Sequence, residues 1–295
     1  MIIQSYAKVN LFLNVLKKRS DNYHNVDTLF ERIGLSDKIT LIPRRDRRIR
    51  VACSHPAVPS GPSNLCFKAA KLLRDSYGVK KGVDISIVKR IPVAAGLGGG
   101  SSNAACVLAG LNKLWGLGLG RDKLAELASG IGSDVVFFIY DAPFARGRGR
   151  GEKIRVLVPL RKQRLWHLLV VPKIAVSTPQ IYRKFDELCG LYNCATGLTK
   201  PPSNVKILTS VLAKKNPIFK SGLLFNSLEQ VTLKLYPEVR RVKERLAALG
   251  LKDVLMSGSG PSVFALVPSR QKAAALARNL KREPCPWSVF AVSTA

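Results

Sequence analysis

The sequence predicts an α+β fold in two domains that meet near residue 160. The chain has 295 residues, of which 46% are hydrophobic, and this suffices for one large or two ordinary cores. The first half holds a strand pattern that runs into a glycine-rich loop and then into a helix. The second half reads helix, strand, strand, helix, strand, which favours an antiparallel sheet with helices on one face. A basic loop at 155–165 separates the halves, so we predict domains at 1–160 and 161–295.

Several elements of the first half follow from local patterns. Mixed apolar and polar runs predict strands at residues 2–16, 38–43 and 48–53. Residues 62–78 predict a helix with Ser63 as its N-cap and Gly78 at its end. The alternating stretch 82–93 predicts a strand that leads into the glycine loop. A helix follows that loop, because its apolar residues repeat with helical spacing at Ala104, Ala105, Val107, Leu108, Leu111 and Leu114.

Asp134 follows a short predicted helix at 121–130, which Gly130 closes. In the second half, Pro237 and Gly250 bound a predicted helix. Residues 252–268 then read as strand, tight glycine turn and strand. A helix at 269–283 and a strand at 287–295 complete the pattern.

Composition excludes several classes of protein. No run of about 18 apolar residues appears, and the first residues lack the features of a signal peptide, so we expect a cytoplasmic protein without a membrane span. The cysteines form no CxxC pair, and the close pair Cys189 and Cys194 has no histidine near it, which argues against zinc and favours reduced thiols. They stand at positions 53, 66, 106, 189, 194 and 285.

The charge is strongly positive, with 48 Lys and Arg against 19 Asp and Glu, a formal net charge of +29. Basic clusters lie at 44–50, 146–155 and 161–164. Such a balance favours polyanionic partners, including nucleotides, nucleic acid or a membrane surface. The basic residues are spread over the chain without interleaved aromatics, so we interpret them as solvated faces and expect no specific nucleic-acid binding.

The glycine loop "GLGGGSS", residues 96–102, predicts a phosphate site. It connects a strand to a helix N-terminus, where unpaired amides and a partial positive charge attract anions. No Gly-Lys-Ser/Thr follows it, so it is not a Walker A loop. Ser101 replaces the third glycine of a Rossmann fingerprint. Tight helix–sheet packing without a ligand would explain a lone glycine cluster equally well.

Three sequence blocks decide between these explanations. They are "PVAAGLGGGSSNA" (92–104), "AKVNLFLNVLKKRSDNYH" (7–24) and "MSGSGPSVFAL" (256–266). Together they resemble the GHMP kinases, which phosphorylate small molecules, over nearly the whole chain. The resemblance implies a two-domain GHMP kinase fold: an N-terminal domain like ribosomal protein S5 domain 2, and a ferredoxin-like α/β C-terminal domain. It also implies ATP as co-substrate and Mg²⁺, for which the sequence indicates no protein ligand.

The resemblance assigns catalytic and substrate-binding residues. Asp134 in "IGSDV" would be the base and Lys8 its partner, and Asn10 would bind substrate from the same strand face. Tyr23 would stack on a cytosine ring, His24 would hydrogen-bond it, and Tyr182 would cover its other face. These blocks resemble the family branch of isoprenoid precursor synthesis, whose substrate is a small alcohol that carries a cytidine diphosphate group.

The nucleotide side follows from the same resemblance. Asn64 and Lys89 match positions that contact adenine. The phosphates would bind to Gly96, Gly98, Gly99, Gly100, Ser101 and Ser102.

Three residues depart from the family pattern. Asn22 replaces a glycine and tolerates a left-handed backbone; Val136 replaces a proline, and Ser227 an aspartate. Two alternatives stay open: a GHMP kinase of the homoserine or mevalonate type, and a basic nucleic-acid-binding protein on a similar fold.

Overall fold

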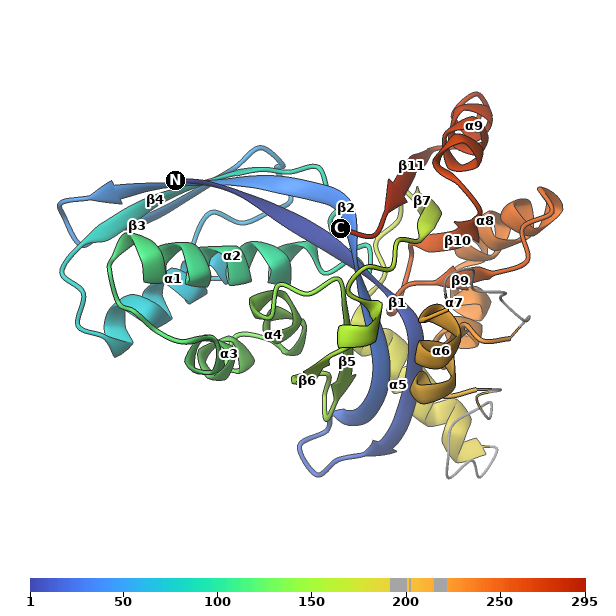
Figure 1. The fold of residues 1–295 in the computed structure, drawn as a ribbon, viewed down its shortest axis with the longest axis horizontal. Helices are drawn as coiled ribbons and strands as arrows, with labels where there is room; N and C mark the ends of the chain where they lie inside the picture. The colour runs from blue at the N-terminus through green and yellow to red at the C-terminus, as the bar shows by residue number, and fades with distance from the viewer. Residues whose placement is uncertain (192–200, 202, 215–221) are drawn as a thin grey trace.

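The described residues form two β-sheets that face each other, each covered by helices on its outer side (Figure 1). This computed structural model describes residues 1–191, 201, 203–214 and 222–295. The fold confirms the predicted α+β class. No helix in these ranges combines the length and the apolar content that a membrane crossing requires.

The first sheet is built on a long antiparallel hairpin of β1 (Ile2–Lys18) and β2 (His24–Arg44). Its strand order is β3-β4-β2-β1-β8, and β5 and β6 extend it from the far end of β2. The other strands are β3 (Ile49–Cys53), β4 (Gly82–Val88), β5 (Phe144–Arg148), β6 (Lys153–Val156) and β8 (Phe225–Asn226).

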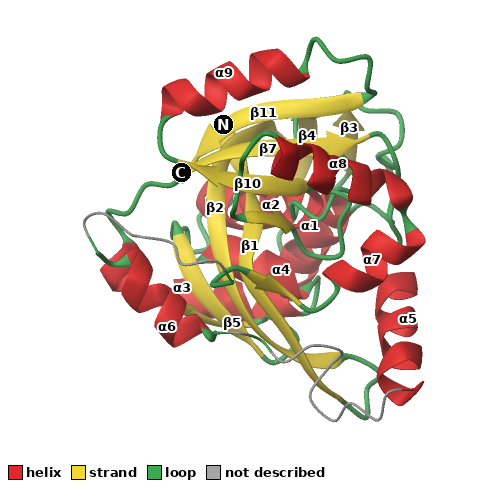
Figure 2. Ribbon diagram, turned by 90° about the vertical axis from the view of Figure 1, so that its right-hand side faces the viewer, coloured by secondary structure: helices red, strands yellow, loops and turns green. Residues whose placement is uncertain are grey.

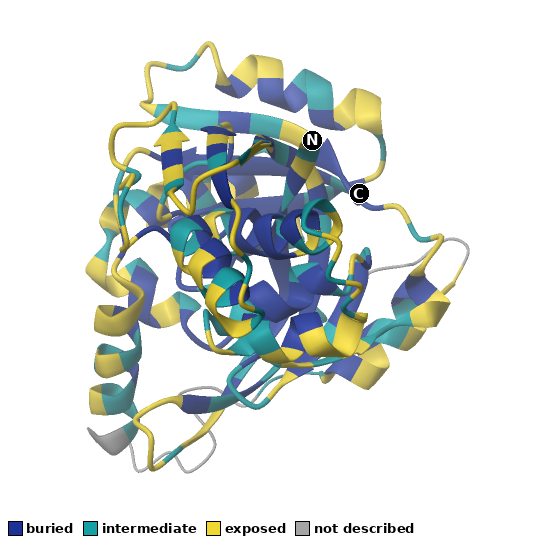
Figure 3. Cartoon of the chain, turned by 90° about the vertical axis from the view of Figure 1, so that its left-hand side faces the viewer, coloured by how far each residue is buried: buried dark blue, intermediate teal, exposed yellow. Residues whose placement is uncertain are grey.

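Helices α1 to α4 cover the outer face of this sheet (Figure 1). Their bounds are α1 (Leu65–Ser76), α2 (Gly99–Leu114), α3 (Arg121–Ser129) and α4 (Ser133–Ile139). The predicted apolar stripe of α2 is buried against the sheet from Ala104 to Leu111, and Figure 3 shows the helices turning their buried faces inward. The predicted cap of α1 was wrong by one residue. Asn64, rather than Ser63, is the N-cap, because its side chain accepts the Cys66 amide at 2.7 Å.

The second sheet has the antiparallel order β11-β7-β10-β9. Its strands are β7 (Trp166–Pro172), β9 (Val254–Met256), β10 (Val263–Val267) and β11 (Trp287–Ser293). Helices pack on one of its faces, as predicted (Figure 2). They are α5 (Thr178–Leu191), α7 (Glu229–Leu235), α8 (Pro237–Ala248) and α9 (Arg270–Leu280).

The inner faces of the two sheets share one apolar layer. Val9 and Leu29 of the first sheet pack in the same buried cluster as Leu169 and Phe264 of the second. Helix α6 (Val205–Leu212) and the 3₁₀ turn η1 (Val158–Leu160) close the edge of this layer. The strand β8 lies beyond residue 160 and yet pairs with β1. The division into 1–160 and 161–295 therefore stays a prediction.

Candidate active site

Two adjoining cavities meet at the glycine loop. The larger has a volume of about 790 Å³ and lies between the β1–β2 hairpin, α4 and α5. The smaller, of about 310 Å³, lies between α1, β4 and the N-terminus of α2. Gly96 and Gly98 line both cavities. A ligand in one cavity therefore approaches a ligand in the other across this loop.

The loop backbone requires its glycines. Gly96 and Gly98 have φ angles of +72° and +67°, in the left-handed region that glycine adopts without strain. Gly98 is also the N-cap of α2, where no described side chain caps the helix and no acidic residue stands in the first turn. The first amides of α2 are thus available to an anion.

Hydroxyl groups from the other glycine motif fix the loop. Ser257 donates to the carbonyl of Gly96 at 3.1 Å, and Ser262 donates to the carbonyl of Ala95 at 2.6 Å. The Lys8 amide donates to the Leu97 carbonyl at 2.9 Å. Three sequence blocks that are far apart in the chain therefore converge on one loop.

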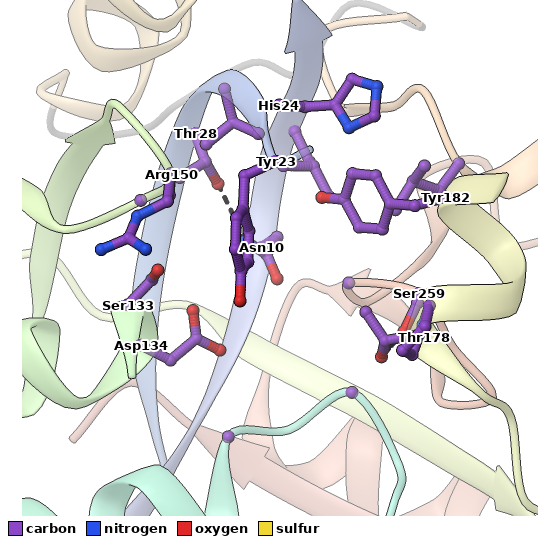
Figure 4. A pocket seen from close by; sticks show the side chains of 18 of the residues that line it. Asn10, Tyr23, His24, Thr28, Ser133, Asp134, Arg150, Thr178, Tyr182 and Ser259 are labelled. Atoms are coloured by element: carbon purple, nitrogen blue, oxygen red, sulfur yellow. Dashed lines mark hydrogen bonds between the residues drawn. The ribbon is translucent and has the colours of Figure 1, made fainter. Parts of the chain in front are cut away.

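Lys8 and Asp134 form an ion pair at the junction of the cavities. Lys8 Nζ lies 3.4 Å from Asp134 Oδ2, and the two side chains are 5% and 36% exposed. Lys8 also donates to Asn10 Oδ1 at 2.8 Å, and the Asn10 amide donates to Thr28 Oγ1 at 2.8 Å (Figure 4). Lys8 and Asn10 thus lie on the same face of β1, as predicted.

Asp134 stands in the first turn of α4, a helix that the sequence did not predict. The positive end of a helix favours a carboxylate at this position. The Asp134 carboxylate points into the larger cavity (Figure 4). The ammonium of Lys8 and the N-terminal end of α4 therefore both lie next to this carboxylate.

The aromatic residues predicted at a base site gather at the far end of the larger cavity. Tyr23 is 56% exposed, whereas His24 is buried and lies 2.6 Å from Asp186 Oδ1 through Nε2. The Tyr182 ring lies 5.3 Å from the His24 ring. Burial, followed by the charge of Asp134, raises the pKa of the Tyr182 phenol, so it stays neutral.

The turn before Tyr23 adopts the backbone that the sequence allowed. Asn22 has φ +65°, so it fills the left-handed position where the family pattern has glycine. The other two departures are accommodated. Val136 is buried in α4, and the Ser227 hydroxyl accepts the Val15 amide at 3.0 Å.

The predicted nucleotide residues separate into two groups. Asn64, Lys89, Gly99, Gly100 and Ser101 line the smaller cavity. Ser102 lines neither cavity, and its hydroxyl accepts a hydrogen bond from Ser5 at 2.8 Å on the buried side of α2.

Asn64 and Lys89 also have partners within the protein. The Asn64 side chain caps α1 and donates to the Pro59 carbonyl at 2.6 Å. The Lys89 ammonium is buried in an ion pair with Asp37, which also accepts the amide of Ile91 at 2.8 Å. Their roles toward a nucleotide stay predictions.

Sequence reasoning missed other residues of the larger cavity. Asp186 lies four residues after Tyr182 on α5, so helical spacing from Tyr182 could have indicated it. Thr178 lies four residues before Tyr182 on α5 and Ser133 adjoins Asp134 on α4, so the same reasoning could have indicated both. Thr28 and Arg150 carried no such signal (Figure 4), because only the tertiary fold brings them to the cavity.

Comparison with known proteins decides the family. Residues 64–142 match the N-terminal domain of GHMP kinases and residues 210–286 match their C-terminal domain. A 4-diphosphocytidyl-2-C-methyl-D-erythritol kinase from Geobacillus sp. (strain WCH70) is 45% identical over 90% of this chain and 88% of that protein.

The chain belongs to the 4-diphosphocytidyl-2-C-methyl-D-erythritol kinases of the GHMP kinase family.

Further relatives agree with this assignment. The kinase of the same name from Bacillus subtilis (strain 168) is 42% identical over 93% of this chain and 91% of that protein. A crystal structure of 4-(cytidine 5'-diphospho)-2C-methyl-D-erythritol kinase superposes with a TM-score of 0.80 at 32% identity over the full length of both chains. A homoserine kinase from Cytophaga hutchinsonii, 18% identical with a TM-score of 0.64, shares the fold alone. These findings favour the predicted kinase over the homoserine or mevalonate type and over a nucleic-acid-binding protein.

Proposed function

We propose that this kinase transfers the γ-phosphoryl group of ATP to the 2-hydroxyl of 4-diphosphocytidyl-2-C-methyl-D-erythritol, in the synthesis of isoprenoid precursors. The hydroxyl oxygen attacks the γ-phosphorus, and the bond between that phosphorus and the β–γ bridging oxygen breaks. ADP leaves with the electron pair of that bond. The hydroxyl proton passes to the Asp134 carboxylate.

One observation carries this proposal: the Lys8–Asp134 pair stands in the larger cavity, which adjoins the smaller one at Gly96 and Gly98. Phosphoryl transfer requires the acceptor hydroxyl and the γ-phosphoryl group to be held in line. An alcohol in the larger cavity and a nucleotide in the smaller one meet across the loop. The Lys8 ammonium then stabilises the negative charge that develops on the oxygens.

We propose that the cytidine end of the substrate binds at the aromatic end of the larger cavity. Tyr23 presents a largely exposed ring, and stacking on a flat base would cover it. Tyr182, neutral and packed on His24, would cover the other face of the base. Asp186 orients the His24 ring through the contact at Nε2, leaving the other ring atoms of His24 for the base.

The smaller cavity is the proposed ATP site. Asn64 and Lys89 would lie near the adenine end, and the amides of Gly98 to Ser101 would hold the phosphates. Mg²⁺ requires few protein ligands, because phosphates and waters fill most of its coordination sphere. The hydroxyl of Ser101, which lines the smaller cavity, fits such an oxygen set. When bound, Mg²⁺ would neutralise phosphate charge during transfer.

We also propose a cytoplasmic location. Cys53, Cys66, Cys106 and Cys285 are free thiols, which fits a reducing compartment. Burial raises the pKa of Cys106 to about 11, so this thiol stays protonated and unreactive.

Replacement of Asp134 by asparagine tests the proposed chemistry. Asp134→Asn keeps the side-chain shape and removes the base, so turnover should fall by about 10²-fold or more. Affinity for ATP should stay within about threefold, since Asp134 lies in the other cavity. The assay is coupled ADP release with the cytidyl substrate, homoserine, mevalonate and no acceptor. Asp122→Asn is the matched control, because Asp122 is an exposed acid in the first turn of α3.

Two results would contradict the proposal. Near-normal turnover of Asp134→Asn would remove the base assignment. Faster ADP release with homoserine or mevalonate than with the cytidyl substrate would remove the substrate assignment.

A further inference from the structure

The basic motif "RGRGR", residues 146–150, separates into three different environments. Arg146 forms a bidentate ion pair with Asp27, with distances of 2.6 and 2.7 Å. Arg148, at the end of β5, is exposed. Arg150 lines the larger cavity, and its guanidinium points toward the region of Ser133 and Asp134 (Figure 4). The motif is therefore more than a solvated basic face.

A tight turn holds the backbone of Arg150. Gly149 and Gly151 on either side have φ angles of +69° and +108°. The Gly151 amide donates to the Arg148 carbonyl at 3.0 Å, and the Arg150 amide donates to Glu152 Oε2 at 2.6 Å. The φ of Gly149 lies in the left-handed region that other residues rarely adopt, which favours glycine at this position of the turn. The Val26 amide of β2 donates to the Gly149 carbonyl at 2.7 Å and joins the turn to the cavity wall.

The guanidinium of Arg150 has no carboxylate within ion-pair distance in the described part of the chain. Two other cations of this cavity are paired: Lys8 with Asp134, and Lys18 with Asp186 at 2.7 Å. Arg183 also lines the cavity, but it is exposed to solvent. Arg150 is half-buried, and its Cζ lies 5.1 Å from the centroid of the Tyr23 ring. Stacking on this ring leaves the N–H groups at the guanidinium edge free to donate.

We propose that Arg150 is a substrate-binding residue that recognises the diphosphate of the cytidyl substrate, and this inference rests on the proposed function. The diphosphate joins the cytidine, assigned to Tyr23, to the alcohol, assigned to Asp134. Arg150 stands beside both residues in the cavity (Figure 4). A guanidinium binds phosphate oxygens through paired N–H donors, which gives both charge and orientation. Its stacking on Tyr23 couples the diphosphate contact to the base contact.

Titration with nucleotides of increasing phosphate content tests the inference. Affinities for cytidine, CMP and CDP are measured by calorimetry with ADP at saturation, for the wild-type kinase and for Arg150→Met. Methionine preserves an apolar cover on Tyr23 and removes the charge. CDP should bind to Arg150→Met at least about tenfold more weakly than to the wild type. The affinity for CMP should fall by a smaller factor, and the affinity for cytidine should not change. Arg150→Lys, which keeps the charge without the paired donors, should recover part of the loss for CDP.

Arg148→Ala is the matched control, because it removes a neighbouring charge that lies outside the cavity, and it should leave all three affinities unchanged. An equal loss for cytidine and CDP in Arg150→Met would show that Arg150 acts through Tyr23 and would overturn the inference. Unchanged CDP affinity would overturn it as well, with the proposed function intact. A wild-type kinase that binds neither cytidine nor CDP would overturn the proposed function and this inference together.

Discussion

At the scale of single residues, the site depends on polar groups that are costly to bury. The Lys8 ammonium is 5% exposed, and burial of a charge is favourable only when partners compensate its lost hydration. Asp134 and Asn10 supply those partners, and Asn10 is held in turn by Thr28. These contacts hold the side chains at the Asp134 end of the larger cavity in place, while Tyr23 at the other end remains largely exposed.

Tyr23 variants should separate base binding from folding. Tyr23→Ala should weaken binding of the cytidyl substrate by about 1–3 kcal/mol, the contribution of stacking between a base and an aromatic side chain. Tyr23→Phe keeps the ring and should bind nearly as well as the wild type. The stability of both variants should change little, since Tyr23 is 56% exposed. Calorimetric titration with substrate and with ATP measures these effects, and an equal loss of ATP affinity in Tyr23→Ala would argue for a role in the fold instead.

At the scale of elements, the two glycine motifs fold against each other. The loop before α2 meets the turn between β9 and β10, where Ser257 and Ser262 donate to its carbonyls. The contact leaves no space for a side chain at Gly96, since a Cβ there would lie 2.4 Å from the Ser257 carbonyl oxygen. Close backbone packing and the left-handed φ of Gly96 thus both demand glycine.

Alanine substitutions within the same loop should have opposite effects. Gly96→Ala adds a backbone clash to a strained φ and should lower the free energy of unfolding by about 2 kcal/mol or more. Gly100→Ala, in the first turn of α2, places its Cβ 3.7 Å from Leu65 Cδ1 and should raise that free energy by about 0.4–1 kcal/mol. Urea unfolding monitored by circular dichroism compares the two variants. Similar stability of both would contradict the packing argument.

At the scale of the whole molecule, the net charge of +29 attracts anions without specifying one. Much of this charge lies outside the cavities. Some of the 48 basic residues are paired with acids, as in Arg44–Asp84 and Arg245–Glu283, and the +29 is the excess that remains after all acids are counted. The proposed contacts to the ATP phosphates, in contrast, come from backbone amides inside a cavity, where bulk ions screen poorly.

Salt should therefore affect nucleic-acid binding far more than catalysis. Labelled RNA should bind in the non-specific range, about 10⁻⁴–10⁻⁶ M at physiological salt, with affinity that falls steeply as salt rises. Kinase activity should decline much less over the same series. Fluorescence anisotropy and the ADP-release assay, run in parallel, make the comparison. Nanomolar binding of a particular RNA sequence that survives physiological salt would reveal a second function.

The sequence could predict those elements in which the spacing of apolar residues matches the face that is buried in the structure. Helix α2 packs one face on a sheet, so its apolar spacing indicates both its type and its buried side. The β9–β10 hairpin has glycines in its turn, and the left-handed position of Asn22 follows from its side-chain chemistry. Strand β2 is different, because residues 28–31 are buried on both faces of the strand, and this run interrupts the alternation that would indicate a half-buried strand. Helix α4 is short and largely buried, so its sequence lacks the alternation of apolar and polar faces from which a helix is predicted.

The sequence by itself determined the family, the phosphate loop and the residue types of the site, because three motifs carry them in contiguous blocks. Only the tertiary structure decided that the Lys8–Asp134 pair stands in the larger cavity, that the loop separates two cavities, and that Arg150 faces the larger one. The physical reason is the range of the interactions. Capping, turns and periodicity depend on residues that are close in the sequence, so a local pattern can predict them. The Lys8–Asp134 ion pair joins residues 126 positions apart in the chain, and only the packing of whole elements brings them together.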